Sequence, residues 1–128
     1  MIKKYFFLCL LFCAVACQKE IEFNIIHFTG YTEIAVEDSA LLYENLQLLQ
    51  DHPKIDVELR GYTDSVGEDS VNMVKSHARA DAIRAWLVSN GVDSLQLYAI
   101  GWGEDDPVGD NHTAEGRALN NRVEFVYK

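Results

Sequence analysis

The chain has 128 residues, of which 48% are hydrophobic and 24% charged, and it carries a formal net charge of −9. This composition fits one compact globular domain with a short additional segment. The acidic excess argues against nucleic acid as a partner and against electrostatic adsorption to anionic lipid.

The first sixteen residues have the build of a secretory signal. Met1 to Lys4 is a short basic stretch, and Tyr5 to Val15 is almost unbroken apolar sequence. A membrane-spanning helix needs roughly 18 or more apolar residues, so this stretch is too short to be a permanent anchor. We therefore expect a lipoprotein signal peptide over residues 1–16, a lipidated cysteine and short linker over 17–20, and a folded domain over 21–128.

All three cysteines lie in or next to this front segment, so no disulfide is expected in the folded domain. Ala14 to Cys17 resembles a bacterial lipobox, in which the cysteine receives acyl chains such as palmitate and becomes the new amino terminus. Gln18 in the second mature position resembles lipoproteins that are sorted to the outer membrane. Two or three chains would make the membrane attachment durable. Ordinary signal cleavage after Ala16 is the alternative.

The folded part is predicted to begin with a strand and a helix. Residues Glu22 to Phe28 are rich in β-branched and aromatic side chains, which favours a strand, and Gly30 to Glu37 is predicted to be a loop. From Asp38 the leucines recur at helical spacing. Asp38 or Ser39 is expected to cap this helix, and Pro53 is expected to end it.

A second strand and a longer helix follow. Ile55 to Leu59 alternates apolar and charged residues, which predicts a half-buried strand running into Gly61. After a loop from Tyr62 to about Glu68, residues Ser70 to Asn90 are predicted to form a long helix. Gly91 then supplies the left-handed stop.

Two further strands complete the domain. They are expected at Leu95 to Trp102 and at Arg122 to Tyr127, with a long irregular loop from Gly103 to Asn121 between them. Long ordered loops in small domains are usually functional. The order strand, helix, strand, helix, strand, loop, strand predicts an α+β domain with one mixed four-stranded sheet covered by two helices.

Asp64 and Arg79 form the most informative pair in the chain. They lie fifteen residues apart and place an anionic and a cationic group at the junction of the second loop and the second helix. Such a pair suits a zwitterionic ligand, because the carboxylate accepts from an ammonium while the guanidinium grips a carboxylate in a two-pronged fork. A structural ion pair that anchors the loop to the helix explains the spacing equally well.

The other polar residues predict no catalytic, cofactor or metal site. Gly101-Trp102-Gly103 lacks the third glycine of a dinucleotide fingerprint, and Asp105-Asp106 is predicted to be a solvated turn. The serines show no base partner or nucleophile elbow, so we do not expect an enzyme. Four histidines show no metal-ligand spacing: His27, His52, His77 and His112.

Residues of about 21 to 128 resemble the OmpA-like carboxy-terminal domain, and the lipobox-like front end makes the resemblance strongest to peptidoglycan-associated lipoproteins. The matching residues, in chain order, are Gly61-Tyr62-Thr63-Asp64, Gly67, Asn72, Ser76, Arg79-Ala80, Ile83, Leu87, Gly91-Val92, Gly101-Trp102-Gly103-Glu104, Pro107, Asn111, Thr113, Gly116-Arg117 and Asn120-Asn121-Arg122-Val123-Glu124.

In that family the residues matching Asp64 and Arg79 hold the diaminopimelate of the peptidoglycan stem peptide without a covalent bond. The resemblance implies an outer-membrane lipoprotein that tethers the membrane to the cell wall. It would face the periplasm of a Gram-negative bacterium and contact other envelope proteins. The ligand-binding residues implied are Asp64, Arg79, Thr63, Asn72, Tyr62 and Arg122.

Three positions depart from the family pattern. Tyr62 replaces the usual His, Lys75 replaces a usual Leu, and Asn121 replaces the first Arg of the usual Asn-Arg-Arg-Val run. The last change removes a positive charge near the expected pocket. With the short linker, Lys75 and Asn121 motivate an alternative: a surface or periplasmic interaction module that keeps the OmpA-like fold and has weakened or lost wall binding.

Overall fold

The computed structural model describes residues 20–128. The predicted signal peptide, Cys17 and most of the linker lie outside the described residues. No helix in the described part is long and apolar enough to cross a membrane. The elements are β1 (Ile26–His27), the 3-10 helix η1 (Val36–Asp38), α2 (Ser39–Asp51), β2 (Val57–Gly61), α3 (Asp69–Ser89), the 3-10 helix η2 (Ser94–Gln96), β3 (Leu97–Gly101), α4 (Ala114–Asn120) and β4 (Arg122–Tyr127).

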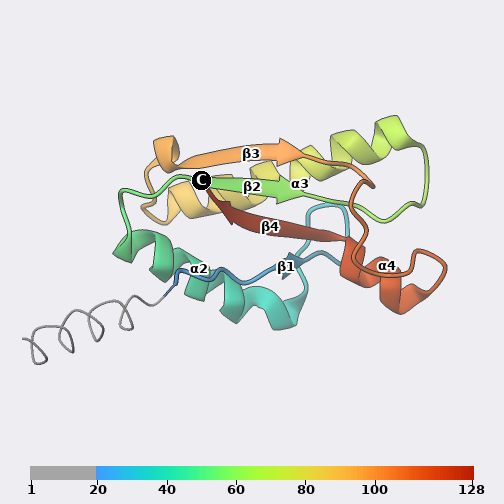
Figure 1. Cartoon of the computed structure of the whole chain (residues 1–128), viewed down its shortest axis with the longest axis horizontal. Coiled ribbons are helices and arrows are strands. Elements are labelled where there is room, and N and C mark those ends of the chain that lie inside the picture. Colours follow the sequence, from blue (N-terminus) through green and yellow to red (C-terminus); the bar gives the residue numbers. More distant parts are fainter. Residues whose placement is uncertain (1–19) are drawn as a thin grey trace, which may run out of the picture.

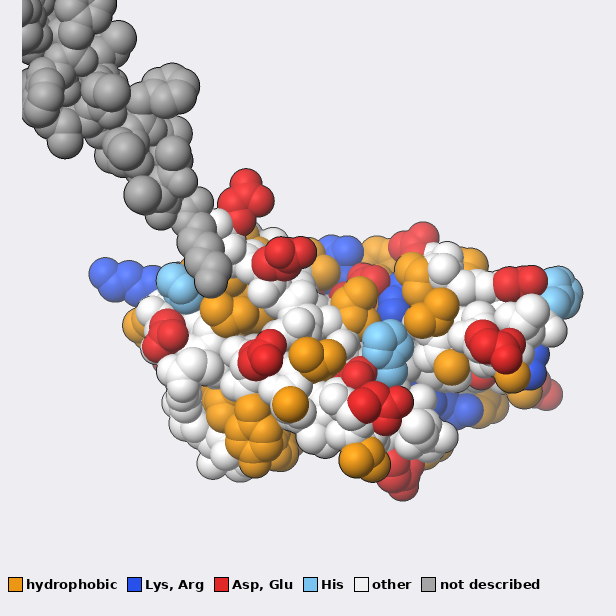
Figure 2. Space-filling view, turned by 90° about the horizontal axis from the view of Figure 1, so that it is seen from below, with side chains coloured by type: hydrophobic (Ala, Val, Ile, Leu, Met, Phe, Trp, Pro, Cys, Tyr) orange, Lys and Arg blue, Asp and Glu red, His pale blue; other side chains and the backbone are white. Residues whose placement is uncertain are grey.

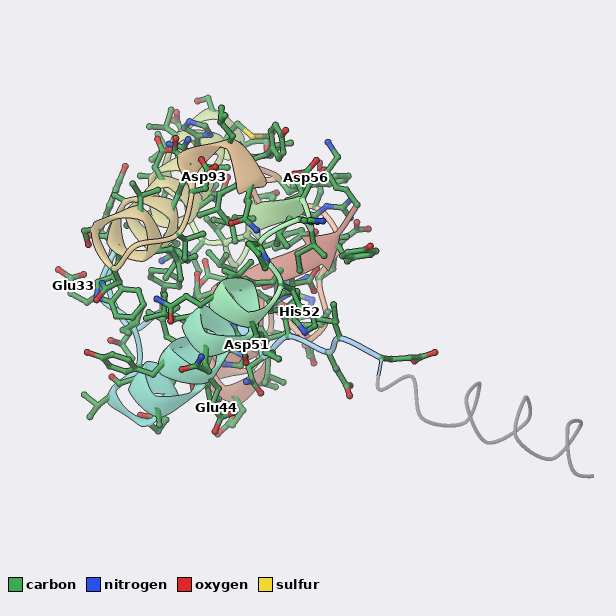
Figure 3. All side chains as sticks on the ribbon, turned by 90° about the vertical axis from the view of Figure 1, so that its left-hand side faces the viewer. Glu33, Glu44, Asp51, His52, Asp56 and Asp93 are labelled. Carbon is green, nitrogen blue, oxygen red and sulfur yellow. The ribbon has the colours of Figure 1, made fainter. Side chains whose placement is uncertain are left out.

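The four strands form one mixed sheet in the order β1-β4-β2-β3 (Figure 1). β2 runs parallel to β3, whereas β4 runs antiparallel to both β2 and β1. Seen from one end, α2 and α3 lie on the same side of the sheet (Figure 3). The predicted fold class and the mixed four-stranded sheet covered by two helices are therefore confirmed.

The core fills the space between the sheet and these two helices. Alternate residues of β2 and β4 contribute to it together with the apolar stripes of α2 and α3, as the sequence periodicity predicted. The buried apolar residues are Ile26, Phe28, Leu42, Leu46, Leu49, Val57, Leu59, Ala80, Ile83, Leu87, Val92, Leu97, Val123 and Phe125. The opposite surface of the sheet, the helix-free face, presents the side chains that alternate with them.

Gly61 lets α3 approach the end of β2. A Cβ atom at this position would lie 1.9 Å from the backbone carbonyl oxygen of Ser76, so any larger residue would force the helix away from the strand. Because of this close contact, the segment after β2 runs directly alongside α3. That segment contains Asp64.

Strand β1 is shorter than the predicted strand from Glu22 to Phe28, because a side chain of α2 forms hydrogen bonds with the backbone just before β1. The Asn45 side chain accepts a hydrogen bond from the Asn24 amide N–H at 2.8 Å and donates one to the Asn24 carbonyl at 2.8 Å. Backbone groups that bond to a side chain are not available for strand pairing. The sheet pairing with β4 therefore starts only at Ile26.

The predicted cap of α2 by Asp38 or Ser39 is wrong. The helix starts at Ser39 without a side-chain cap. The Asp38 carboxylate instead accepts from the His27 amide N–H at 2.7 Å, and the His27 ring Nδ1 lies 2.7 Å from the same oxygen. A tertiary contact between Asp38 and β1 has thus replaced the expected helix cap. The predicted left-handed stop at Gly91 is confirmed, with φ of 98°.

The predicted irregular loop from Gly103 to Asn121 contains a short helix, α4. The Thr113 hydroxyl caps it by accepting from the Gly116 amide N–H at 3.0 Å. A helix of seven residues that includes a glycine shows too little apolar periodicity to be recognised. The Asn120 side chain accepts from the amides of Val108 and Gly109 and so holds the preceding loop against the helix.

Replacing Asn45 with Ala should lower the free energy of unfolding by about 1–3 kcal/mol, since it leaves the Asn24 backbone groups without their partners. Urea unfolding followed by circular dichroism measures the difference. Gln47→Ala changes an exposed residue of the same helix and serves as the control. Equal losses in the two variants would contradict this account of β1.

Candidate functional site

The candidate site forms where β2 ends and β4 begins, at the right of Figure 1. The antiparallel register pairs Gly61 with Val123, so the loop after β2 lies beside the turn that leads into β4. The Tyr62 amide donates to the Arg122 carbonyl at 2.8 Å and extends this pairing. Arg79 reaches the same point from α3.

Arg79 is buried, with 4% of its surface exposed. Its Nε–H donates to the Tyr31 carbonyl at 2.9 Å, and Nη1 donates to the Tyr62 carbonyl at 3.0 Å and to Asn121 Oδ1 at 2.8 Å. Its Nη2 donates to the Gly30 carbonyl at 2.8 Å. A guanidinium has five N–H donors, so a single N–H of Nη2 is left without an acceptor inside the protein.

The groups that accept hydrogen bonds from Arg79 are polar but uncharged. Burial lowers the pKa of its guanidinium below the ordinary value, and the negative charge of Asp64 partly opposes this effect. A buried charge is costly unless it is hydrogen-bonded, and here three backbone carbonyls and one amide oxygen supply the acceptors. The Phe28 ring also lies 5.4 Å from the guanidinium carbon. Arg79 is thus a structural cation as well as a candidate ligand contact.

Asp64 is half-buried at the surface of the loop. Its Oδ1 accepts from the Val66 amide N–H at 3.0 Å, and its Oδ2 accepts from Asn121 Nδ2 at 2.8 Å. Each carboxylate oxygen can accept a further hydrogen bond. Within residues 20–128, Asp64 and Arg79 form no direct ion pair; Asn121 connects them instead. The carboxylate therefore has no cation bound to it within the described residues, and it keeps free acceptor positions.

Thr63 and Asn72 lie beside Asp64, whose backbone carbonyl accepts from Asn72 Nδ2 at 3.4 Å. The buried Thr63 donates its amide to the Gly103 carbonyl at 2.8 Å and its hydroxyl to the Asp64 carbonyl at 2.8 Å. Asn72 Nδ2 donates to a Glu104 carboxylate oxygen at 2.9 Å. Its Oδ1 is buried without a hydrogen-bond partner in the protein. Buried acceptors are rarely left without a partner, and because this oxygen is enclosed by protein, a ligand would reach it only after the surrounding side chains moved.

Tyr62 and Arg122 lie together on the helix-free face instead. The Arg122 guanidinium carbon is 3.9 Å from the centroid of the Tyr62 ring, and its Nε donates to Glu124 at 3.1 Å. Its other nitrogens donate to the carbonyls of Asn120 and Asp106. The side chains of Tyr62 and Arg122 form no hydrogen bond with Asp64 or Arg79 among the described residues; only the Tyr62 carbonyl contacts Arg79.

Three contributors to the site were not predicted. Gly30 and Tyr31 bind Arg79 only through their backbone carbonyls, for which the sequence gives no signal. Asn121 was recognised as a departure from the family pattern but not as a site residue. Its position directly before β4, opposite the end of β2, was the available signal. No cluster of three or more metal-ligating side chains occurs among residues 20–128.

The comparisons with known proteins show the family and agree with the fold. The OmpA family matches residues 28–121. Outer membrane porin F of Pseudomonas fluorescens is 47% identical over 73 residues, which are 57% of this chain and 22% of that protein. The peptidoglycan-binding protein ArfA of Mycobacterium tuberculosis is 39% identical over 74 residues, 58% of this chain and 23% of ArfA. The chain thus spans about a fifth of the length of these two relatives.

Among solved structures, the peptidoglycan-associated lipoprotein from Burkholderia pseudomallei is similar with a TM-score of 0.74 and 30% sequence identity. The match covers 81% of this chain and 89% of that chain. The cell wall anchor of the type VI secretion system from Pseudomonas aeruginosa is similar with a TM-score of 0.66 and 28% identity, covering 79% and 76% of the two chains.

Alkaline pH should destabilise the domain through Tyr62. Burial, with a smaller effect of Glu124, raises the pKa of the Tyr62 hydroxyl above its ordinary value. The unfolded chain therefore loses this proton first, near pH 10, and the free energy of unfolding falls as pH rises beyond that point. In Tyr62→Phe this fall should be smaller, as measured by urea unfolding between about pH 8 and 10.5. Tyr43→Phe, at an exposed position, should retain the wild-type slope.

Proposed function

The chain belongs to the OmpA family, and from this premise we propose that it binds peptidoglycan non-covalently at the Asp64 and Arg79 site. The ligand is the zwitterionic end of diaminopimelate in the stem peptide, which carries an ammonium and a carboxylate on one carbon. The single observation that carries the proposal is a charged, partly exposed carboxylate held beside a buried guanidinium without pairing to it.

The two charged groups would divide the ligand between them. Asp64 accepts from the ammonium with the acceptor positions that its internal hydrogen bonds leave free. Arg79 meets the carboxylate with its remaining Nη2 N–H and its positive charge, so the contact is one-pronged rather than the two-pronged fork expected from sequence. A charge-assisted hydrogen bond contributes roughly 1.5 to 3 kcal/mol, so two of them give only about millimolar to micromolar affinity. Many copies acting on one polymer would hold it collectively.

The acidity of the domain supports local rather than long-range recognition. Loss of Lys3 and Lys4 with the predicted signal would leave nine basic against 20 acidic residues. Asp and Glu side chains are spread over the face shown in Figure 2 and outnumber the basic ones there. Such a surface does not attract an anionic wall from a distance. Affinity therefore has to come from the site itself.

The position of the site suits a domain anchored at its amino terminus. Glu20 lies beside Leu48 and His52, at the end where β2 begins; Figure 3 views this end and labels His52. The site lies at the opposite end, where β2 stops (Figure 1). A three-residue linker reaches only about 10 Å, but the domain itself would project the site away from a membrane.

The full proposal is a lipoprotein anchored by acyl chains on Cys17 in the outer membrane of a Gram-negative bacterium, facing the periplasm and tethering that membrane to the wall. The lipobox-like Ala14 to Cys17 supports the anchor. The structural likeness to a peptidoglycan-associated lipoprotein supports the tethering role. The role is one of binding, without a catalytic step, and leaves room for contacts with other envelope proteins.

The second candidate is an interaction module in which wall binding is weak or lost. The occupied donors of Arg79 and the neutral amide at Asn121 favour it, because both reduce the attraction for a carboxylate. Protease treatment of intact cells separates the two candidates. We expect the domain to be protected by the outer membrane, and digestion from outside would contradict the tether.

Wall binding itself is tested by sedimentation of the purified mature protein with sacculi that contain diaminopimelate. Asp64→Asn should weaken binding about tenfold or more, since it removes the charge that meets the ammonium while keeping the side-chain shape. Asp105→Asn removes an equal charge from an exposed loop and should bind like the wild type. Equal binding by the two variants would rule out the proposed pocket.

A further inference from the structure

The amide of Asn121 has all its hydrogen-bonding capacity in use. Its Oδ1 accepts from Arg79 Nη1 at 2.8 Å and from the Asp64 amide N–H at 3.1 Å. Its Nδ2 donates to Asp64 Oδ2 at 2.8 Å and to the Arg117 carbonyl at 3.0 Å. Two donors and two acceptors are the full set of a side-chain amide. One side chain therefore links the loop after β2 with α3 and α4.

The neighbours of Asn121 fix the orientation of this amide. A guanidinium and a backbone N–H can only donate, and they meet Oδ1, whereas a carboxylate and a backbone carbonyl can only accept, and they meet Nδ2. Turning the amide over would bring donor against donor and acceptor against acceptor at all four contacts. The oxygen therefore faces Arg79 and the N–H groups face Asp64.

From this arrangement we infer that Asn121 is a positioning residue that keeps Asp64 and Arg79 connected but unpaired, so that both charges stay available to a zwitterionic ligand. The inference rests on the proposed function and specifies how the site works. Without the amide, Asp64 loses a donor and Arg79 loses an acceptor. The simplest repair is a direct ion pair between them, which uses up the charges that the ligand needs.

Two variants separate positioning from simple structural support. Asn121→Leu has a similar size and offers no polar contact. Asn121→Asp keeps an acceptor for Arg79 but turns the donor toward Asp64 into a second carboxylate. Close carboxylates repel when both are ionised, and a single proton shared between them restores the donor and the net charge of the wild-type pair.

Other charged groups also surround this point. Arg79 of α3 contacts Asn121 with its guanidinium, whereas Arg117 of α4 contacts it only through its backbone carbonyl, and Glu33 acts on Arg79 from the loop after β1. Lys75 lies one turn before Arg79, with its Nζ 5.8 Å from the centroid of the Tyr31 ring. All of them are present in wild type and variants alike, so the ratio of variant to wild-type binding at each pH isolates the effect of position 121.

The experiment measures sacculus binding and urea unfolding for wild type, Asn121→Leu and Asn121→Asp at about pH 7 and pH 5. We expect both variants to bind about tenfold less than wild type at pH 7. At pH 5, Asn121→Asp should return to within about threefold of wild type and gain stability relative to it. Asn121→Leu should remain weak at both pH values.

The outcomes distinguish the inference from the proposed function. If the wild type fails to bind sacculi, the proposed function is wrong, and the positioning role for that ligand falls with it. If the wild type binds and Asn121→Leu binds equally well, only the inference is wrong. Identical ratios for Asn121→Asp at both pH values would likewise overturn it, because a merely structural role predicts no recovery. Should Asn121→Leu fail to fold, the pH response of Asn121→Asp decides alone.

Discussion

The burial of the Arg79 guanidinium is the constraint on which the rest of the site depends. Removing a charge from water is costly, and a buried cation is stable only if its donors find acceptors. Three of the acceptors here are the carbonyls of Gly30, Tyr31 and Tyr62, which belong to the loop after β1 and to the residue that follows β2. Because α3 carries the charge, the helix, the strand end and the loop have to stay in one arrangement. The contacts that satisfy Arg79 therefore also hold together the segments that form the candidate site.

This constraint divides the work between the two charged residues. Four of the five N–H donors of Arg79 bond to groups within the domain, so Arg79 retains one N–H and its positive charge for a ligand. Asp64 remains half-exposed with free acceptor positions. Asn121 joins them without cancelling either charge. The sequence suggested two equal partners that either grip a ligand or pair with each other. In the structure, Arg79 is a buried cation that holds the fold together, Asp64 is a half-exposed anion, and Asn121 is a neutral residue that connects them.

The periodicity of the sequence predicted those helices and strands that are determined by residues close together in the chain. The alternation through Val57 and Leu59 predicted β2, and Gly91 predicted the end of α3, because these signals lie within a few residues. The prediction failed where a tertiary contact overrode the local pattern, as at β1, which is shortened by the contact of Asn45 with Asn24. It also failed where the element was too short to show a period, as at α4. Within the site, the location of Asp64 and Arg79 could be predicted, but the bridge could not, since its partners come from distant segments. Arg122 was assigned to the site from the family resemblance; its alternation with the buried Val123, which places its side chain on the other face of the sheet, was a signal that this assignment did not use.

Under the proposed function, the neutral residue at position 121 would also change what the site recognises. A cation there would lie against the Asp64 carboxylate, pair with it and compete with the ammonium of a ligand. The amide of Asn121 supplies one hydrogen bond to Asp64 and leaves its negative charge intact. The same change removes a charge that would attract the ligand's carboxylate, for which Arg79 offers a single N–H. In the proposed binding mode, the balance of recognition would therefore move toward the ammonium end of the ligand. Modifications of the stem peptide that block its amine should matter more to this domain than those that mask its carboxylate.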